Sequence, residues 1–181
     1  EKICNTYSLY QKPNGSIVLH RNEDTINLHT LCYALEGLLF TYNVNKNEKH
    51  LKSCTEAIKW CKQKIQDDGS IALWINTKYR AKACYPVAQL IRIMLLIDKL
   101  NKNNENKEAV GKLYSFLLTL QSKDDKIQQS GAFYEEYYKS VFGWKLRQKL
   151  NSWGSMFALQ ALYWYDNFDK INFDDEIDLL Y

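Results

Sequence analysis

One pattern, a Gln followed by a Gly, a small residue and then hydrophobic residues, occurs three times and constrains the fold of this chain more than any other feature. The copies read QKPNGSIVL, QDDGSIALW and QQSGAFYEEYY. Their glycines are Gly15, Gly69 and Gly131, so the copies lie 54 and 62 residues apart. Self-similarity on this scale predicts stacked supersecondary units.

The segments between the copies have the hydrophobic periodicity of helices, because their apolar residues recur at spacings of three and four. Segments 85–100 and 153–165 are apolar nearly all round, which predicts inner helices, and segment 31–42 takes the same place in the first unit. Segments 47–65 and 108–121 are amphipathic and are predicted to lie outside. Each unit is therefore an outer helix, a Gly turn, a long loop and an inner helix. Units repeated in one sense place all the loops on one rim, where a site is expected.

Composition excludes several classes of function. The net charge is only +3, with Lys and Arg interspersed among Asp and Glu, so nucleic acid is not an expected partner. No apolar run approaches the roughly 20 residues of a membrane span. The five cysteines form no CxxC pair and predict reduced thiols and a cytoplasmic location. The first residues, EKICNTYSLY, lack the pattern of a signal peptide, and a start other than Met fits a piece of a longer protein.

The order HTLCYALEGLL, DGSI, CYPVAQLIRIMLL and LNSWGSMFALQAL resembles the α/α toroids. The Gln-to-Gly turns are similar to those of squalene cyclases and prenyltransferase β-subunits, and the whole order is closer to toroid proteins of bacterial polysaccharide metabolism. The resemblance implies an all-α fold over residues 1–168, followed by an acidic tail at 169–181. A closed six-hairpin toroid has about twelve helices and this chain only five or six, on ordinary helix lengths. We therefore expect an incomplete toroid or open arc, completed by self-association or by a larger parent chain.

Candidate site residues lie on the predicted loops and at the starts of the inner helices. Paired carboxylates perform acid and base chemistry on glycosidic bonds, a proton-transferring His can assist, and aromatic rings or Arg can hold sugars. The candidates for catalysis are Asp68, Glu135, Glu136 and His29, and those for substrate binding are Tyr33, Trp74, Tyr79, Arg80, Tyr85, Tyr134 and Trp153. Solvated turns, helix caps and core packing are the alternative interpretations of the same residues.

No cofactor and no metal site are predicted. The DxDD motif of the cyclases and the His/Cys/Asp set of zinc prenyltransferases are absent, and the DDEID at 174–178 is a weak match to a magnesium motif. The first hypothesis is a domain that binds or processes a glycan in bacterial polysaccharide metabolism. A non-catalytic helical-repeat module or partial toroid is the second, and an isoprenoid-binding toroid is the third. Whether the chain is an enzyme stays open at this point.

Overall fold

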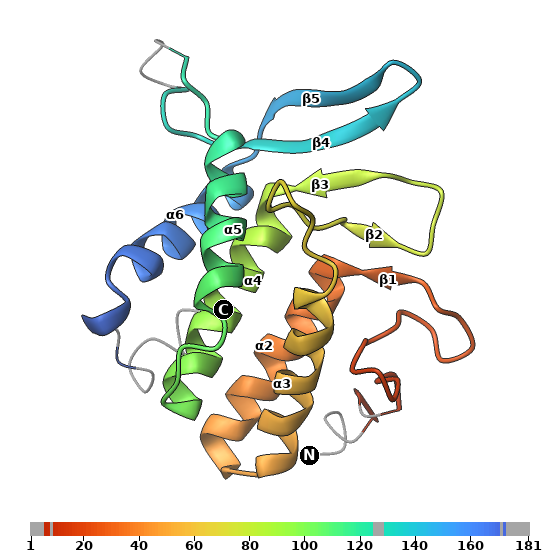
Figure 1. Ribbon diagram of the computed structural model, residues 1–181, viewed down its shortest axis with the longest axis vertical. Helices are drawn as coiled ribbons and strands as arrows, with labels where there is room; N and C mark the ends of the chain where they lie inside the picture. Colours follow the sequence, from red (N-terminus) through yellow and green to blue (C-terminus); the bar gives the residue numbers. More distant parts are fainter. Residues whose placement is uncertain (1–5, 8, 125–128, 171, 173–181) are drawn as a thin grey trace.

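The computed structural model describes residues 6–7, 9–124, 129–170 and 172. In this part of the chain, five α-helices form two helical hairpins and one further helix (Figure 1). These are α2 (Leu28–Asn45), α3 (Glu48–Lys62), α4 (Cys84–Asn101), α5 (Lys107–Thr119) and α6 (Ser152–Asp166), and the 3-10 helix η1 (Phe168–Lys170) follows. The inner helices α2, α4 and α6 begin at the same end of the molecule, and α3 and α5 run back outside them. The predicted alternation of inner and outer helices is confirmed, and it makes the described chain an open arc of helical hairpins.

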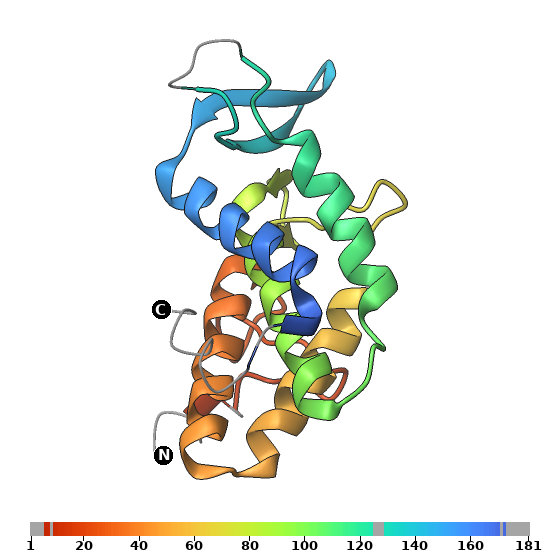
Figure 2. The ribbon, with the colours of Figure 1, turned by 90° about the vertical axis from the view of Figure 1, so that its left-hand side faces the viewer.

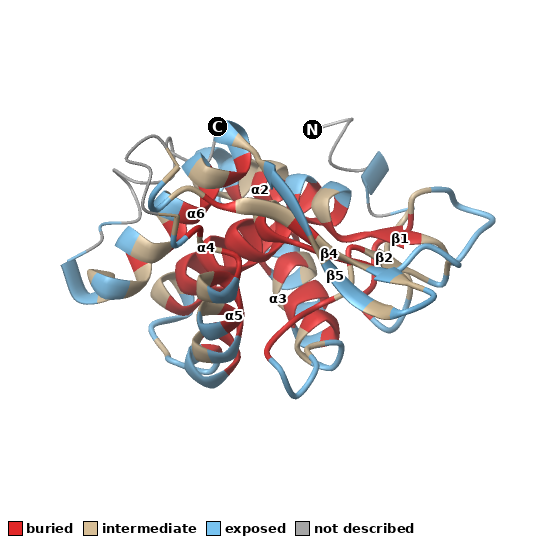
Figure 3. Cartoon of the chain, turned by 90° about the horizontal axis from the view of Figure 1, so that it is seen from above, coloured by how far each residue is buried: buried red, intermediate tan, exposed pale blue. Residues whose placement is uncertain are grey.

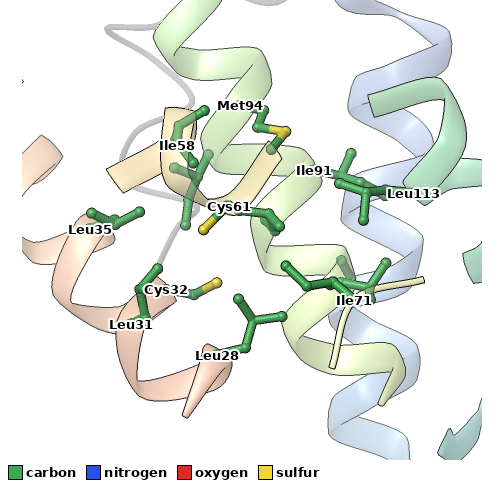
Figure 4. Close-up of a cluster of buried hydrophobic side chains, with 14 of the residues drawn as sticks. Leu28, Leu31, Cys32, Leu35, Ile58, Cys61, Ile71, Ile91, Met94 and Leu113 are labelled. Carbon is green, nitrogen blue, oxygen red and sulfur yellow. The ribbon is translucent and has the colours of Figure 1, made fainter. Parts of the chain in front are cut away.

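The core lies between the inner and the outer helices. In α3, Leu51, Cys54, Ile58 and Cys61 are buried as the predicted stripe requires, and they pack with residues of α2 and α4 (Figure 4). The central inner helix α4 is buried on nearly every side, because α2, α5 and α6 all pack against it. Burial is concentrated between the helices and exposure on the outer surfaces (Figure 3).

The three Gly turns share one hydrogen-bond pattern. The amides of Gly15, Gly69 and Gly131 donate to the carbonyls of Lys12, Gln66 and Ser122, respectively. This register makes Gln11 equivalent to Gln121, and both side-chain amides donate to the carbonyl of the turn glycine, at 3.2 Å. The Gln-to-Gly spacing in the sequence does not keep this register, because Ile65 takes the equivalent place in the second turn, one residue before Gln66, and Gln121 lies ten residues before Gly131 in the third.

Two of these turns pack tightly against the next outer helix. A Cβ on Gly15 would lie 2.4 Å from the carbonyl oxygen of Glu56 in α3, and one on Gly69 would lie 2.1 Å from that of Lys112 in α5. Both glycines also have positive φ, +91° and +78°. Glycine is required there because no side chain fits between the turn and the helix. These two Gly turns thus link one unit to the next.

The prediction of an all-α fold is wrong in one respect, because the loops after the Gly turns contain two small antiparallel sheets. One pairs β1 (Ile26–Asn27) with β2 (Trp74–Ile75), and the other has the order β3 (Ala81–Ala83), β4 (Tyr134–Ser140), β5 (Gly143–Leu150). Long loops must satisfy their backbone N–H and C=O groups, and Tyr-rich segments favour strands. The sheets lie beside the starts of the inner helices and form the rim (Figure 1).

The last inner helix differs from its prediction as well, since α6 is buried on one side only. Figure 2 views the molecule from the side on which α6 lies. Trp153, Met156, Leu159 and Tyr163 form an exposed stripe there, because no helix in the described part of the chain covers it. The predicted tail and its DDEID lie almost wholly outside the described residues. Among the helices that are described, none has the length and apolarity that crossing a membrane requires.

Candidate functional site

Four aromatic side chains meet where the inner helices begin. His29 and Tyr33 come from the start of α2, Tyr85 from that of α4 and Trp153 from that of α6. The ring centroid of His29 lies 4.4 Å from that of Tyr33, 4.7 Å from that of Tyr85 and 5.2 Å from that of Trp153. All four are among the residues that the sequence singled out, and the structure brings them together. We call them the aromatic cluster.

Two rings of the aromatic cluster are exposed to a ligand, and the other two support them. Tyr33 and Trp153 are 41% and 45% exposed, whereas His29 and Tyr85 are half-buried beneath them. Asn27 and Asn151 cap α2 and α6 by accepting the amides of Thr30 and Gly154, both at 3.0 Å. These caps fix where the helices start and therefore where the rings stand. Exposed rings held this way can stack on the face of a sugar.

A buried chain of polar contacts runs beneath the cluster and joins the three inner helices. His29 Nδ1 lies 2.5 Å from Gln89 Oε1, and Gln89 Nε2 donates to Glu36 Oε2 at 3.1 Å. Arg92 Nη2 donates to Glu36 Oε1 at 2.8 Å, and its Nη1 donates to Gln160 of α6. The guanidinium also lies over the rings of Phe157 and Trp164, 4.7 and 5.8 Å from their centroids. We call His29, Glu36, Gln89, Arg92 and Gln160 the inner polar network.

This network determines the protonation of His29. Since the amide nitrogen of Gln89 donates to Glu36, its oxygen faces His29 and can only accept, so Nδ1 of His29 carries the proton. Burial lowers the pKa of His29 and favours the neutral ring, although the hydrogen bond to Gln89 opposes this shift. A neutral ring protonated at Nδ1 has its lone pair on Nε2. His29 can therefore accept a proton at the rim.

Glu36 and Arg92 form an ion pair in which both side chains are 0% exposed. Burial raises the pKa of Glu36 to about 7, against the opposing effects of Arg92 and Gln89. Neither residue was predicted from the sequence. The available signal was one charged residue in the middle of an otherwise apolar stretch of each helix, in YALEGLL and LIRIMLL, and such residues are buried only when they are paired.

On the rim sheet, Glu136 is the buried carboxylate nearest the aromatic cluster. It is 5% exposed, and its Oε1 accepts from the hydroxyl of Tyr79 at 2.8 Å and lies 3.1 Å from Nη2 of Arg147. Glu136 pairs with Ala83, two residues before Tyr85, which places it close to the cluster. Burial raises the pKa of Tyr85 to about 12, and the negative charges of Glu136 and Glu135 contribute to this rise. The neighbouring Glu135 is half-buried, 3.5 Å from Nζ of Lys149.

Asp68 lies on the other face of this sheet. Its Oδ2 is 2.7 Å from Nζ of Lys82, and Lys82 precedes Ala83, which pairs with Glu136. Adjacent residues of a strand point to opposite faces, whereas directly paired residues share one, so Asp68 and Glu136 do not face each other across a cleft. Although burial raises its pKa, hydrogen bonds from Lys82 and Ser70 bring the pKa of Asp68 below its usual value.

The turn itself accounts for Asp68. Its Oδ1 accepts from the amide and the hydroxyl of Ser70, at 3.0 and 2.5 Å. In the first unit, Asn14 accepts from the amide and the hydroxyl of Ser16 in the same way, at 3.0 and 2.8 Å. The contacts of Asp68 are therefore those expected of a residue that stabilises a solvated turn.

The remaining candidates line the rim at other places. Trp74 pairs with Asn27 between the two short strands, and it packs against the same small cluster of Leu73, Ala81 and Ala83 as Tyr85 does. Arg80 ends the β2–β3 loop with an exposed side chain. The hydroxyl of Tyr134 lies 3.3 Å from that of Ser122 in the third Gly turn. The described site therefore centres on the aromatic cluster and Glu136, with Trp74 at its edge.

Comparison with known proteins gives the fold. No protein-family model and no curated protein sequence matches the chain. Among solved structures, a family 76 glycoside hydrolase from a bovine Bacteroides thetaiotaomicron strain superposes with a TM-score of 0.70 at 10% identity, over 91% of this chain and 37% of that one.

The α-1,6-mannanase of family 76 from a Salegentibacter species superposes with a TM-score of 0.68 at 12% identity. An inactive variant with two Asp-to-Asn changes, in complex with α-1,6-mannotriose, gives the same values. Each of these two comparisons covers 97% of this chain and 67% of the other, so the chain spans between about a third and two thirds of the enzymes that it resembles. The described residues therefore form an arc of an α/α toroid, the fold of these glycoside hydrolases.

Proposed function

We propose that this chain is a carbohydrate-processing α/α-toroid domain of bacterial polysaccharide metabolism and that its glycan binds over the aromatic cluster. The observation that carries the proposal is the convergence of rings from three inner helices beside the buried carboxylate Glu136. The likeness in fold to enzymes that act on α-1,6-mannan supports the same class of ligand.

The chemistry proposed for the site follows from the protonation of its groups. His29, protonated at Nδ1, can accept a proton at Nε2. Glu136, which accepts from Tyr79 and pairs with Arg147, is a buried carboxylate beside the proposed sugar site. Glu135 stands next to it as the second carboxylate. In this proposal Tyr33, Tyr85 and Trp153 bind the sugar rings, while Asp68 closes a turn.

The test is a calorimetric titration of the chain with α-1,6-mannotriose and with a panel of other bacterial oligosaccharides. Replacing Trp153 by Ala should weaken binding about tenfold, since aromatic stacking contributes roughly 0.5–1.5 kcal/mol. Tyr163→Ala is the matched control, because Tyr163 lies on the same helix and is also exposed, but at the other end. Equal affinities for both variants and the wild type would refute the proposed site, as would a folded chain that binds none of the sugars.

The exposed stripe of α6 supports a second proposal: in the functional assembly, another helix packs against α6 and covers the stripe. Met156, Leu159 and Tyr163 are 46%, 68% and 56% exposed, on a helix whose other side is buried. A second copy of the chain, or a further part of a parent chain, would bury them. Light scattering tests self-association directly, and a Leu159→Glu variant should abolish any dimer found.

The isoprenoid alternative has less support. A binding toroid of that kind would hold an apolar cavity between its inner helices, whereas the Glu36–Arg92 ion pair occupies that region here. The apolar groove beside α2, lined by Tyr10, Val18 and Ala34 among others, lies at the edge of the arc. A cytoplasmic location is part of the proposal, supported by the four described cysteines, which are all buried free thiols.

A further inference from the structure

The β4–β5 hairpin ends in two apolar residues that nothing in the described fold covers. Val141 is 98% exposed and Phe142 is 89% exposed, and they form the turn between Ser140 and Gly143, which pair with each other. The hairpin projects beyond the helices (Figure 1). Turns of this kind usually carry Gly, Asn or Asp, and two adjacent large apolar side chains in water are unfavourable. We call Val141 and Phe142 the hairpin tip.

Cations and a Trp stand directly behind the tip. Nζ of Lys145 lies 5.5 Å from the ring centroid of Phe142, and Nζ of Lys139 lies 5.5 Å from that of Trp144, which is 42% exposed. The amide of Lys139 donates to the carbonyl of Arg80 at 2.9 Å, so the β2–β3 loop lies beside the hairpin. Within the described residues, no carboxylate is at ion-pair distance from Lys139 or Lys145.

The charge of this region is opposite to that of the rest of the chain. Residues 76–82 and 137–149 contain seven of the 24 Lys and Arg and none of the 21 Asp and Glu. The remaining residues therefore carry a net charge of −4, although the whole chain is at +3. Three of the seven pair with carboxylates just outside these ranges, Lys82 with Asp68, Arg147 with Glu136 and Lys149 with Glu135. The other four, Lys78, Arg80, Lys139 and Lys145, leave the hairpin and the β2–β3 loop positively charged, which directs them toward a negatively charged surface.

We propose that the hairpin tip inserts into the interfacial region of an anionic lipid membrane and holds this domain at its surface. The hairpin matches the depth profile of a bilayer surface, with apolar side chains at its tip and, directly behind them, an amphipathic Trp paired with Lys139 at the level of the headgroups. Each Lys or Arg near an anionic surface contributes about 1 kcal/mol. A second copy of the chain docked through the same tips would bring two positively charged hairpins together, and a soluble polyanion would leave Val141 and Phe142 in water.

The experiment is co-sedimentation of the full chain with vesicles of phosphatidylcholine alone and of phosphatidylcholine mixed with phosphatidylglycerol. The wild type should sediment only with the mixed vesicles, and added NaCl should release it. Lys139→Gln with Lys145→Gln should lower the partition coefficient about 30-fold, from the two cations lost. Val141→Ser with Phe142→Ser should lower it more than about tenfold while the charge stays the same. Lys49→Gln with Lys59→Gln removes the same charge from exposed positions of α3 and should leave binding unchanged.

Three results would overturn the proposal. These are equal binding to both kinds of vesicle, a serine variant that binds as well as the wild type, and no vesicle binding by a chain that instead binds polygalacturonate through Lys139 and Lys145. Circular dichroism melts show whether each variant is folded, and a full loss of structure is not expected because both tip residues are exposed. The outcome is independent of the sugar titration, since neither Trp153 nor Glu136 is altered.

Discussion

Replacing Gly69 by Ala tests whether the Gly turns join the units of the arc. The new Cβ would lie 2.1 Å from the carbonyl oxygen of Lys112, and the φ of +78° is unfavourable for any residue with a Cβ. Gly131→Ala is a matched control, because its φ is also +78° but the nearest atom to its Cβ would be 3.9 Å away, at Nε2 of Gln121. The two variants share the backbone cost and differ in the contact with the next outer helix.

The expected loss in the free energy of unfolding follows from these two costs. A left-handed conformation costs about 1–2 kcal/mol for a residue with a Cβ. Relieving the contact with Lys112 requires a shift of the turn or of α5, and overpacking of that kind costs a further 1–3 kcal/mol, roughly. Gly131→Ala should therefore destabilise the chain by about 1–2 kcal/mol, and Gly69→Ala by about 2–5 kcal/mol.

Urea denaturation followed by circular dichroism measures the difference. At an unchanged m value, the midpoint for Gly69→Ala should be clearly the lower of the two. Equal midpoints would refute the reasoning, because the packing of the turn on α5 would then contribute nothing. Gly15→Ala, whose Cβ would lie 2.4 Å from the carbonyl oxygen of Glu56, should behave like Gly69→Ala.

Three further predictions concern buried or paired charges. Burial raises the pKa of Glu36 from 4.5 to about 7. The free energy of unfolding of the wild type, relative to that of Glu36→Gln, should therefore be greatest below pH 4.5 and should fall by up to about 3 kcal/mol as the pH rises to 7. Parallel curves of stability against pH for the two proteins would contradict this. Arg92→Leu should destabilise by about 3–5 kcal/mol in thermal melts, since it leaves Glu36 buried without its cation, and adding Glu36→Gln should restore part of the loss. Asp68→Asn should leave any glycosidase activity intact, because Asn serves the same turn at position 14, but it should destabilise the chain by about 1–3 kcal/mol, because it leaves the buried ammonium of Lys82 without its carboxylate; a large loss of activity would return Asp68 to the catalytic site.

The helices were predictable from the sequence because apolar residues at spacings of three and four mark each helix, and the contrast between amphipathic and nearly all-apolar segments distinguishes outer from inner helices. The strands were not, since the residues after each Gly turn were interpreted as loops with aromatic side chains, although YEEYYKS and GWKLRQKL are of strand length and rich in Tyr or alternating. The register of the third turn escaped prediction because extra residues separate Gln121 from Gly131, and only the hydrogen bonds identify the equivalent Gln.

The site was predictable in part for a similar reason. His29, Tyr33, Tyr85 and Trp153 all fall at the start of a predicted inner helix, so repetition alone places them on one rim. The carboxylates depended on a sheet that was not foreseen, and its two faces separate Asp68 from Glu136. Glu36 and Arg92 were missed because a lone charge in an apolar helix has a partner only in three dimensions.

The inner polar network has a mechanical consequence for the rim. Apolar helix interfaces can slide by a fraction of an ångström at little cost, whereas hydrogen bonds lose strength quickly when their angle or length changes. Because Arg92 bonds to both Glu36 of α2 and Gln160 of α6, the three inner helices are locked in one axial alignment. A displacement of α6 along its axis would therefore strain the bond between Gln160 and Arg92, and the contacts of Arg92, Glu36 and Gln89 connect that bond to the ring of His29.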